Sequence, residues 1–149
     1  EYTVWLLERS IKTLFIRVQA QNNNAKLIAD FLENESWVER VYYPGLKSHP
    51  NHNIAKMQMK GFGGMLSFDL VPEIDSKKFL LGLNLIKPTI SLAGIESTAL
   101  SPSLTSHSLL TETERLSQGI TLQMIRLSAG IESIDDLKND LLQSIKKQN

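Results

Sequence analysis

The stretch MIRLSAGIE, residues 124–132, alternates apolar and polar side chains in the way that one strand of a half-exposed sheet does. Ile125 and Leu127 should face one side of the sheet, and Arg126, between them, should face the other. The stretch GGMLSFDL, residues 63–70, has the same two-sided pattern. A parallel sheet that is covered on both faces would instead read as continuous Val, Ile and Leu. The two stretches therefore favour an α+β fold over an α/β fold.

Arg126 raises the question of why a strand should carry a guanidinium group there. In TISLAG, residues 89–94, the same alternation puts Ser91 on a face of small and polar side chains. If the two strands lie close together, Ser91 and Arg126 share a surface where a hydroxyl group and a guanidinium fork can hold a carboxylate. The alternative is an ordinary arginine on an open sheet face, and spacing alone favours that alternative.

The remaining segments alternate between strand and helix patterns, which predicts helices packed against one sheet of about four strands. Residues 95–110 are rich in Ser and Thr, so a loop with room for one short strand is expected there. The expected strands are 37–45, 63–72, 89–94 after Pro88, and 124–130. The expected helices are 49–61, 74–84, 111–119, which opens on a capping box of Thr111 and Glu114, and 133–147, which Ser133 caps. Residues 35–149 thus form one α+β sheet domain, and residues 1–149 a single unit.

A long helix should precede this sheet, since apolar residues recur at helical spacing from Tyr2 to about Asn34. It is one helix or two in tandem, with its weak point at QNNNA, residues 21–25, because asparagine lowers helix propensity. Thirty helical residues span about 45 Å, more than the width of a small domain. The first half is therefore expected to need a partner surface outside this chain, which is consistent with a fragment of a larger protein.

The composition excludes several kinds of partner. The 149 residues are 42% apolar, and 16 basic residues balance 16 acidic ones, so no net charge draws the chain to nucleic acid. No apolar run reaches the roughly 20 residues of a membrane span. Cysteine is absent, which fits a reducing compartment and a cytoplasmic location.

Three motifs that could carry chemistry have more ordinary interpretations. Gly61–Gly64 opens a strand rather than a helix, which is unlike a dinucleotide-binding loop. His49 and His52 lie around a proline without a third ligand, so no metal site is expected. His107 has only its serine neighbours in TSHS, whereas catalytic groups are assembled in space. The aromatic residues expected to pack in cores are Trp5, Phe15, Trp37 and Phe68.

Three longer stretches together resemble one enzyme family. They are VERVYYPGLKSHPNHNIAKMQMKGFGGMLSFDL at residues 38–70, SLAGIESTALSPSLTSHS at residues 91–108 and MIRLSAGIESIDDL at residues 124–137. In this order they resemble the C-terminal part of the Cys/Met metabolism pyridoxal-phosphate enzymes, which include cystathionine β-lyase, cystathionine γ-synthase, cystathionine γ-lyase and methionine γ-lyase. The resemblance implies the small C-terminal domain of a fold-type I enzyme, with the long linking helix (residues 1–34) that leads into it.

The resemblance also implies roles for individual residues. The family arginine that grips the substrate α-carboxylate falls on Arg126, and the serine that lines the same pocket falls on Ser91, next to the backbone of Leu92. A guanidinium group suits the task because it stays charged and offers two parallel donors. Ile90 lies where γ-synthases and γ-lyases that act on cystathionine often carry an acid, so an apolar residue favours β-lyase or methionine γ-lyase chemistry.

Some family features are altered here. The glycine after the family serine is Ala93, and the family threonine contact falls only weakly on Ser106. No lysine has the setting of the Schiff-base lysine, since Lys12 lies within a helical pattern. The pyridoxal-phosphate-binding large domain is absent from this sequence, so no catalytic residue and no bound cofactor are expected in this chain alone.

The resemblance implies a parent enzyme with pyridoxal phosphate as cofactor, a sulfur-containing amino acid as substrate, and a homotetrameric assembly. This chain would contact its own N-terminal cofactor domain. The alternative is a stand-alone binding or interaction domain that has kept the fold without catalysis. The sequence upstream in the gene distinguishes the two hypotheses.

Overall fold

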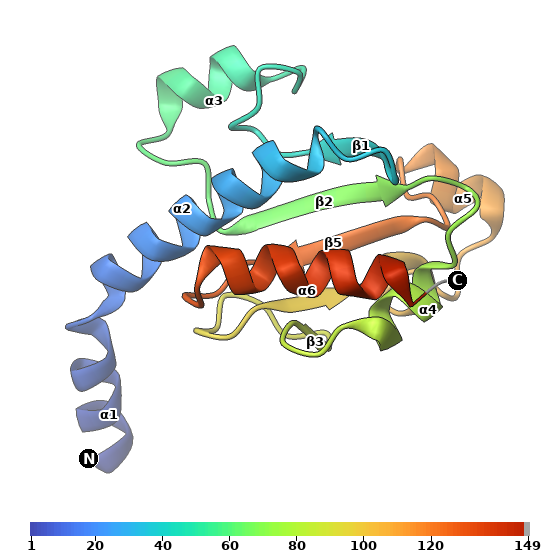
Figure 1. Ribbon diagram of the computed structural model, residues 1–149. Helices are drawn as coiled ribbons and strands as arrows, with labels where there is room; N and C mark the ends of the chain where they lie inside the picture. The colour runs from blue at the N-terminus through green and yellow to red at the C-terminus, as the bar shows by residue number, and fades with distance from the viewer. Residues whose placement is uncertain (148–149) are drawn as a thin grey trace.

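A mixed sheet with helices on one face forms the centre of the computed structural model, which describes residues 1–147 (Figure 1). The strands are β1 (Val38–Tyr42), β2 (Met65–Leu70), β3 (Lys87–Pro88), β4 (Thr98–Leu100) and β5 (Met124–Ser128). The helices are α1 (Tyr2–Ile11), α2 (Leu14–Leu32), α3 (His52–Gln58), α4 (Ser76–Gly82), α5 (Glu112–Ser117) and α6 (Ile134–Lys146), with a 3₁₀ turn at Pro102–Leu104.

The strands are arranged in the order β1-β2-β5-β4-β3. All neighbouring pairs are antiparallel except β3 and β4, which are parallel. This arrangement confirms the α+β class. The predicted number of strands was wrong, because the described sheet has five strands rather than about four. The added strand is β4, which lies within the Ser/Thr-rich segment where a short strand was allowed.

The core lies between the sheet and the helices α2 and α6, which run side by side across one face (Figure 1). Period-two alternation produces this face, since Leu66 pairs with Leu127 and Phe68 with Ile125. All four of these side chains are buried. Both helices contribute apolar residues three or four positions apart, namely Ala25, Ile28, Ala29 and Leu32 from α2 and Leu137 and Leu141 from α6.

The predicted strand at residues 89–94 was wrong, because the only strand of this segment is β3, Lys87–Pro88, which lies just before it. Lys87 and Pro88 pair with β4, and the chain then leaves the sheet edge. The N–H of Thr89 still donates to the carbonyl oxygen of Ala99 at 3.1 Å, which is the last such bond to β4 before the loop. Ala93 has a φ angle of +61°, which no strand accommodates. Residues 89–94 are therefore an exposed loop on the molecule.

The N-terminal helical region is two helices in tandem, one of the two forms expected. The break lies at Lys12–Thr13, and the predicted weak point at residues 21–25 was wrong. Thr13 leaves helical geometry, with φ −106° and ψ 2°. Residues 21–25 stay helical because Gln21 and Asn24 make hydrogen bonds to distant parts of the chain, which offset their low propensity.

The termini of three predicted helices can be compared with the structure. Helix α3 ends at Gln58 rather than at Gly61. Helix α5 begins with the predicted capping box, in which Thr111 and Glu114 each bond the backbone N–H of the other. Helix α6 follows Ser133 as predicted, although the Ser133 side chain makes no capping hydrogen bond.

Two of the four aromatic residues expected in cores are there, and two are not. Trp37 and Phe68 are buried, and their ring centroids lie 6.3 Å apart. Trp5 is 53% exposed and Phe15 is 72% exposed, so for these two the prediction was wrong. Trp5 lies on α1 and Phe15 lies at the start of α2. This part of the helical region extends away from the sheet (Figure 1).

Candidate functional site

The sheet face opposite α2 and α6 presents the polar half of the strand alternation. Arg126 on β5 lies between Ser67 of β2 and Leu100 of β4, its partners in register. Ser67 in turn pairs with Tyr42 of β1. These residues share one face because paired residues on neighbouring strands point to the same side. Arg126 therefore lies in the middle strand of this face.

Arg126 contacts the loop of residues 89–94 through its guanidinium group. Its Nη2 atom donates a hydrogen bond of 3.1 Å to the carbonyl oxygen of Ile90. The Arg126 side chain is half-buried, and no carboxylate in residues 1–147 lies within ion-pair distance of it. A guanidinium group has five N–H donors, and one bond to a carbonyl leaves most of them available to an anion.

The loop places the other predicted residues close to Arg126 in the chain. Ser91 and Leu92 directly follow Ile90, and both are exposed. The Ser91 carbonyl oxygen accepts a bond of 2.8 Å from Thr98 Oγ1, which holds the loop against β4. Within the described residues no hydrogen bond joins the Ser91 hydroxyl group to Arg126. The structure thus brings Arg126 directly to Ile90, with Ser91 next in sequence.

Ala93 holds the far end of this loop in an unusual conformation. Its φ of +61° lies in the left-handed region that glycine adopts at little cost. Its N–H donates a hydrogen bond of 2.9 Å to Ser128 Oγ, on the same sheet face as Arg126. The family glycine that Ala93 replaces is therefore at a position where the backbone favours glycine.

A second polar group on this face went unnoticed in the sequence. Asp69 is buried, and its carboxylate accepts hydrogen bonds of 2.7 Å from Tyr42 Oη and from Thr121 Oγ1. Burial, followed by the hydrogen bond to Asp69, raises the pKa of Tyr42 to about 12. Tyr42 is therefore a neutral donor at neutral pH. The aspartate in GGMLSFDL sits on the predicted polar face, and that was the available signal.

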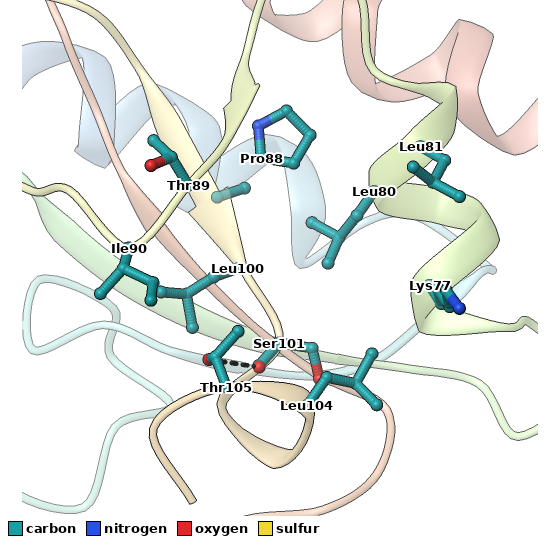
Figure 2. A pocket seen from close by; sticks show the side chains of 11 residues that line it. Lys77, Leu80, Leu81, Pro88, Thr89, Ile90, Leu100, Ser101, Leu104 and Thr105 are labelled. Carbon is teal, nitrogen blue, oxygen red and sulfur yellow. Dashed lines mark hydrogen bonds between the residues drawn. The ribbon is translucent and has the colours of Figure 1, made fainter. Parts of the chain in front are cut away.

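A largely apolar cavity lies next to Ile90. Figure 2 shows it between α4, the segment Pro88–Ile90, the end of β4 and the turn that follows. Its volume is about 380 Å³. The lining includes Leu80, Leu100 and Leu104, together with the single charged residue Lys77. Ile90 thus accepts a hydrogen bond from Arg126 and also lines this cavity.

Two histidines of the motifs for which no chemistry was expected each lie close to an oxygen atom nearby in the chain. His52 Nδ1 lies 2.9 Å from the carbonyl oxygen of Pro44, and His107 Nδ1 lies 2.8 Å from Ser106 Oγ at the surface. In residues 1–147 no three His, Cys, Asp or Glu side chains are grouped as metal ligands. Across the same residues, no helix combines the length and apolar character needed to cross a membrane.

The residues around Arg126 do not make up a site for pyridoxal phosphate. Strands β2, β4 and β5 contain no lysine that could form the cofactor linkage. Among lysines elsewhere, Lys87 pairs with Glu96 at 2.8 Å and Lys26 pairs with Asp30. The face around Arg126 thus carries a guanidinium group, and strands β2, β4 and β5 carry no lysine beside it.

Comparisons with known proteins agree with the resemblance found in the sequence. The model of a family described as Cys/Met metabolism PLP-dependent enzyme matches residues 1–146. Cystathionine beta-lyase of Lactococcus lactis is 44% identical over 144 residues, which are 97% of this chain and 38% of that protein. Cystathionine gamma-lyase of Bacillus subtilis is 44% identical over 142 residues, 95% of this chain and 38% of that protein.

A solved structure is similar to this chain in its three-dimensional fold as well. The crystal structure of cystathionine gamma-lyase from Lactobacillus plantarum, complexed with L-serine, matches with a TM-score of 0.91 at 42% identity. The match covers 97% of this chain and 38% of that one. The chain therefore spans little more than a third of the length of these relatives.

Proposed function

The chain belongs to the Cys/Met metabolism family of PLP-dependent enzymes, and from this premise we propose that it is the substrate-carboxylate-binding C-terminal domain of a larger enzyme. That enzyme is a pyridoxal-phosphate-dependent lyase or transferase that acts on sulfur-containing amino acids. Residues 1–34 are its linking helical region, and residues 35–149 its α+β sheet domain. Catalytic residues and the cofactor linkage belong to the rest of the enzyme.

The observation that carries this proposal is that the guanidinium group of Arg126 has no carboxylate partner among the described residues. A half-buried guanidinium group with no carboxylate partner among the described residues is a suitable binding site for an α-carboxylate. A bidentate pair would fix the orientation of the amino acid, which is what bond cleavage next to a cofactor requires. Ser91 and the Leu92 backbone line the same pocket in this proposal.

Ile90 is the proposed specificity residue. Its side chain is 66% exposed and also lines the apolar cavity, so it offers no charge to the far end of a substrate. As the family resemblance implies, an apolar residue at this position is in keeping with β-lyase or methionine γ-lyase chemistry. Overall identity does not separate these reactions, since a β-lyase and a γ-lyase both match at 44%.

The proposed partner of this chain is its own cofactor domain. Helix α1 buries none of its residues, and its exposed side chains include Val4, Trp5 and Leu7. Contiguous apolar surface of this kind is typical of a contact with another protein surface. In this proposal the parent enzyme is cytoplasmic, and it is a homotetramer, as the family resemblance implies.

Replacement of Arg126 by alanine in the full-length enzyme tests the carboxylate role. We expect kcat/KM to fall about 10- to 100-fold, mostly through a higher KM, because hydrogen bonds to a charged group contribute about 1.5–3 kcal/mol. The cofactor spectrum should not change. Arg40→Ala, an exposed arginine on β1, is the matched control.

An unchanged kcat/KM in Arg126→Ala would contradict the assignment. The upstream reading frame tests the larger claim. A cofactor domain with its lysine in frame before Glu1 supports the enzyme, whereas a start codon directly before Glu1 supports a stand-alone binding domain.

A further inference from the structure

Two amide side chains of α2 are buried although the first half of that helix is exposed. Gln21 and Asn24 lie three positions apart, hence on one helical face, and are 8% and 6% exposed. Asn23, between them, is exposed. Amides are poor helix formers, so burying two of them in mid-helix calls for a compensating interaction.

The compensation consists of three hydrogen bonds to backbone carbonyl groups. Gln21 Nε2 donates to the carbonyl oxygen of Gly94 at 2.7 Å. Asn24 Nδ2 donates to the carbonyl oxygens of Gly130 at 3.1 Å and of Glu132 at 2.9 Å. Gly94 closes the loop of residues 89–94, and Gly130 lies just beyond β5, which carries Arg126. The two amides therefore hold the ends of the segments that form the carboxylate site.

These two segments are also bound to each other. Ser97 Oγ donates to Glu132 Oε2 at 2.8 Å, and the N–H of Gly130 donates to Ser97 Oγ at 2.8 Å. The N–H of Ile131 donates to the carbonyl oxygen of Ile95 at 2.9 Å. Residues 94–97 and 130–132 thus form one hydrogen-bonded unit, and Gln21 and Asn24 attach that unit to helix α2.

We propose that Gln21 and Asn24 are positioning residues of the carboxylate site, which fix the loop of residues 89–94 relative to Arg126. This inference rests on the proposed function. Neither amide contacts Arg126 in the structure; both act through the carbonyl groups that they hold. Binding groups must be held within about 0.5 Å of their productive geometry, so such tethers matter for binding as well as for folding.

Two substitutions remove the donors. Asn24→Asp keeps the shape but turns a donor into a charged acceptor that faces two carbonyl groups. Gln21→Met keeps the length of the side chain without a donor or a charge, so it tests the proposal if Asn24→Asp fails to fold. Asn23→Asp makes the same chemical change on the exposed side of the helix and is the matched control.

Amide hydrogen exchange in the 149-residue chain is the first measurement. We expect the amides of Ala93 and Ile131 to exchange about tenfold faster in Asn24→Asp and Gln21→Met. The amide of Leu70, which donates to Gln123 within the core sheet, is the internal reference and should not change. If the exchange rate rose equally at all amides, Leu70 included, the protein would be destabilised as a whole, and the proposal would be overturned.

Kinetics of the full-length enzyme give the second measurement. We expect about a tenfold higher KM in both variants, with a smaller change in kcat and no change in Asn23→Asp. If Arg126→Ala raises KM but the two variants change neither KM nor exchange, the positioning role is wrong and the proposed function stands. If Arg126→Ala has no effect, the proposed function itself fails, whatever the exchange data give.

Discussion

Ala93 is a residue whose backbone and side chain are in conflict. Its φ of +61° places Cβ where an L-residue is strained by about 1–2 kcal/mol. The conformation persists because the Ala93 N–H bonds Ser128 Oγ and because Thr98 holds the Ser91 carbonyl oxygen. The surrounding bonds thus impose the loop shape on a residue that does not favour it.

Ala93→Gly should therefore stabilise the protein by up to about 1 kcal/mol. Relief of strain exceeds the conformational entropy that glycine adds to the unfolded chain, which is about 0.4–1 kcal/mol. Urea unfolding followed by circular dichroism measures the change. Ala55→Gly in helix α3 is the control, and it should destabilise by about 0.5–1 kcal/mol. If Ala93→Gly and Ala55→Gly destabilised the protein equally, the backbone of Ala93 would not be strained.

Single residues were predicted from the sequence to different degrees. Period two placed Arg126 on the polar face, and the structure has it there opposite Ser67. The same rule failed for Ser91, because the chain leaves the sheet edge after Thr89 and the loop conformation depends on contacts with β5. Alternation describes residues that stay in a sheet, and it says nothing about where a loop goes after leaving one. The functional roles of these residues stay predictions.

At the scale of elements, helix α2 shows how tertiary contacts override propensity. The run QNNN predicted a weak point, yet the helix breaks at Lys12–Thr13 instead. The partners of Gln21 and Asn24 lie more than 70 positions away in the chain, so no local pattern could reveal them. Helix α5, by contrast, starts with a capping box that is entirely local and was predicted correctly.

The capping box of α5 predicts a pH dependence of stability. Hydrogen bonds from the Thr111 side chain and backbone hold the pKa of Glu114 below its ordinary value. A lowered pKa in the folded state means that the stabilisation is present above the ordinary pKa and is lost as the pH falls through the lowered value.

Glu114→Gln should therefore lower the free energy of unfolding at pH 7, and the difference from the unmodified protein should shrink at about pH 3. Urea titrations at the two pH values measure it. Glu112→Gln, in the same first turn but outside the capping box, should show a smaller change. A difference that is constant with pH would contradict the role of the carboxylate.

At the scale of the whole molecule, the chain is a packed sheet domain with a helical arm. The core joins α2, α6 and the sheet, whereas α1 contributes no buried residue. The sequence predicted the helical spacing of this arm, whereas its need for a partner surface stays a prediction. It did not show which of its apolar residues would remain exposed, because helical spacing alone does not identify the covering surface.

Removal of residues 1–12 should change the free energy of unfolding by less than about 0.5 kcal/mol, since every one of these residues is exposed. Self-association in sedimentation velocity should decrease with the loss of this apolar surface. Leu137→Ala in α6 is the contrasting variant and should cost about 2–5 kcal/mol. A loss of comparable size on removing the arm would show that α1 belongs to the folded core.

The two outer strands give the sheet a resistance to aggregation. A register shift between Val38 and Arg40 interrupts β1, and β3 is only two residues long and ends in Pro88. A continuous row of free N–H and C=O groups is what an invading strand from another chain needs. Neither edge of the described sheet offers such a row. Contacts between copies of this protein should therefore form through helical surfaces, without the cross-strand pairing that leads to fibrils.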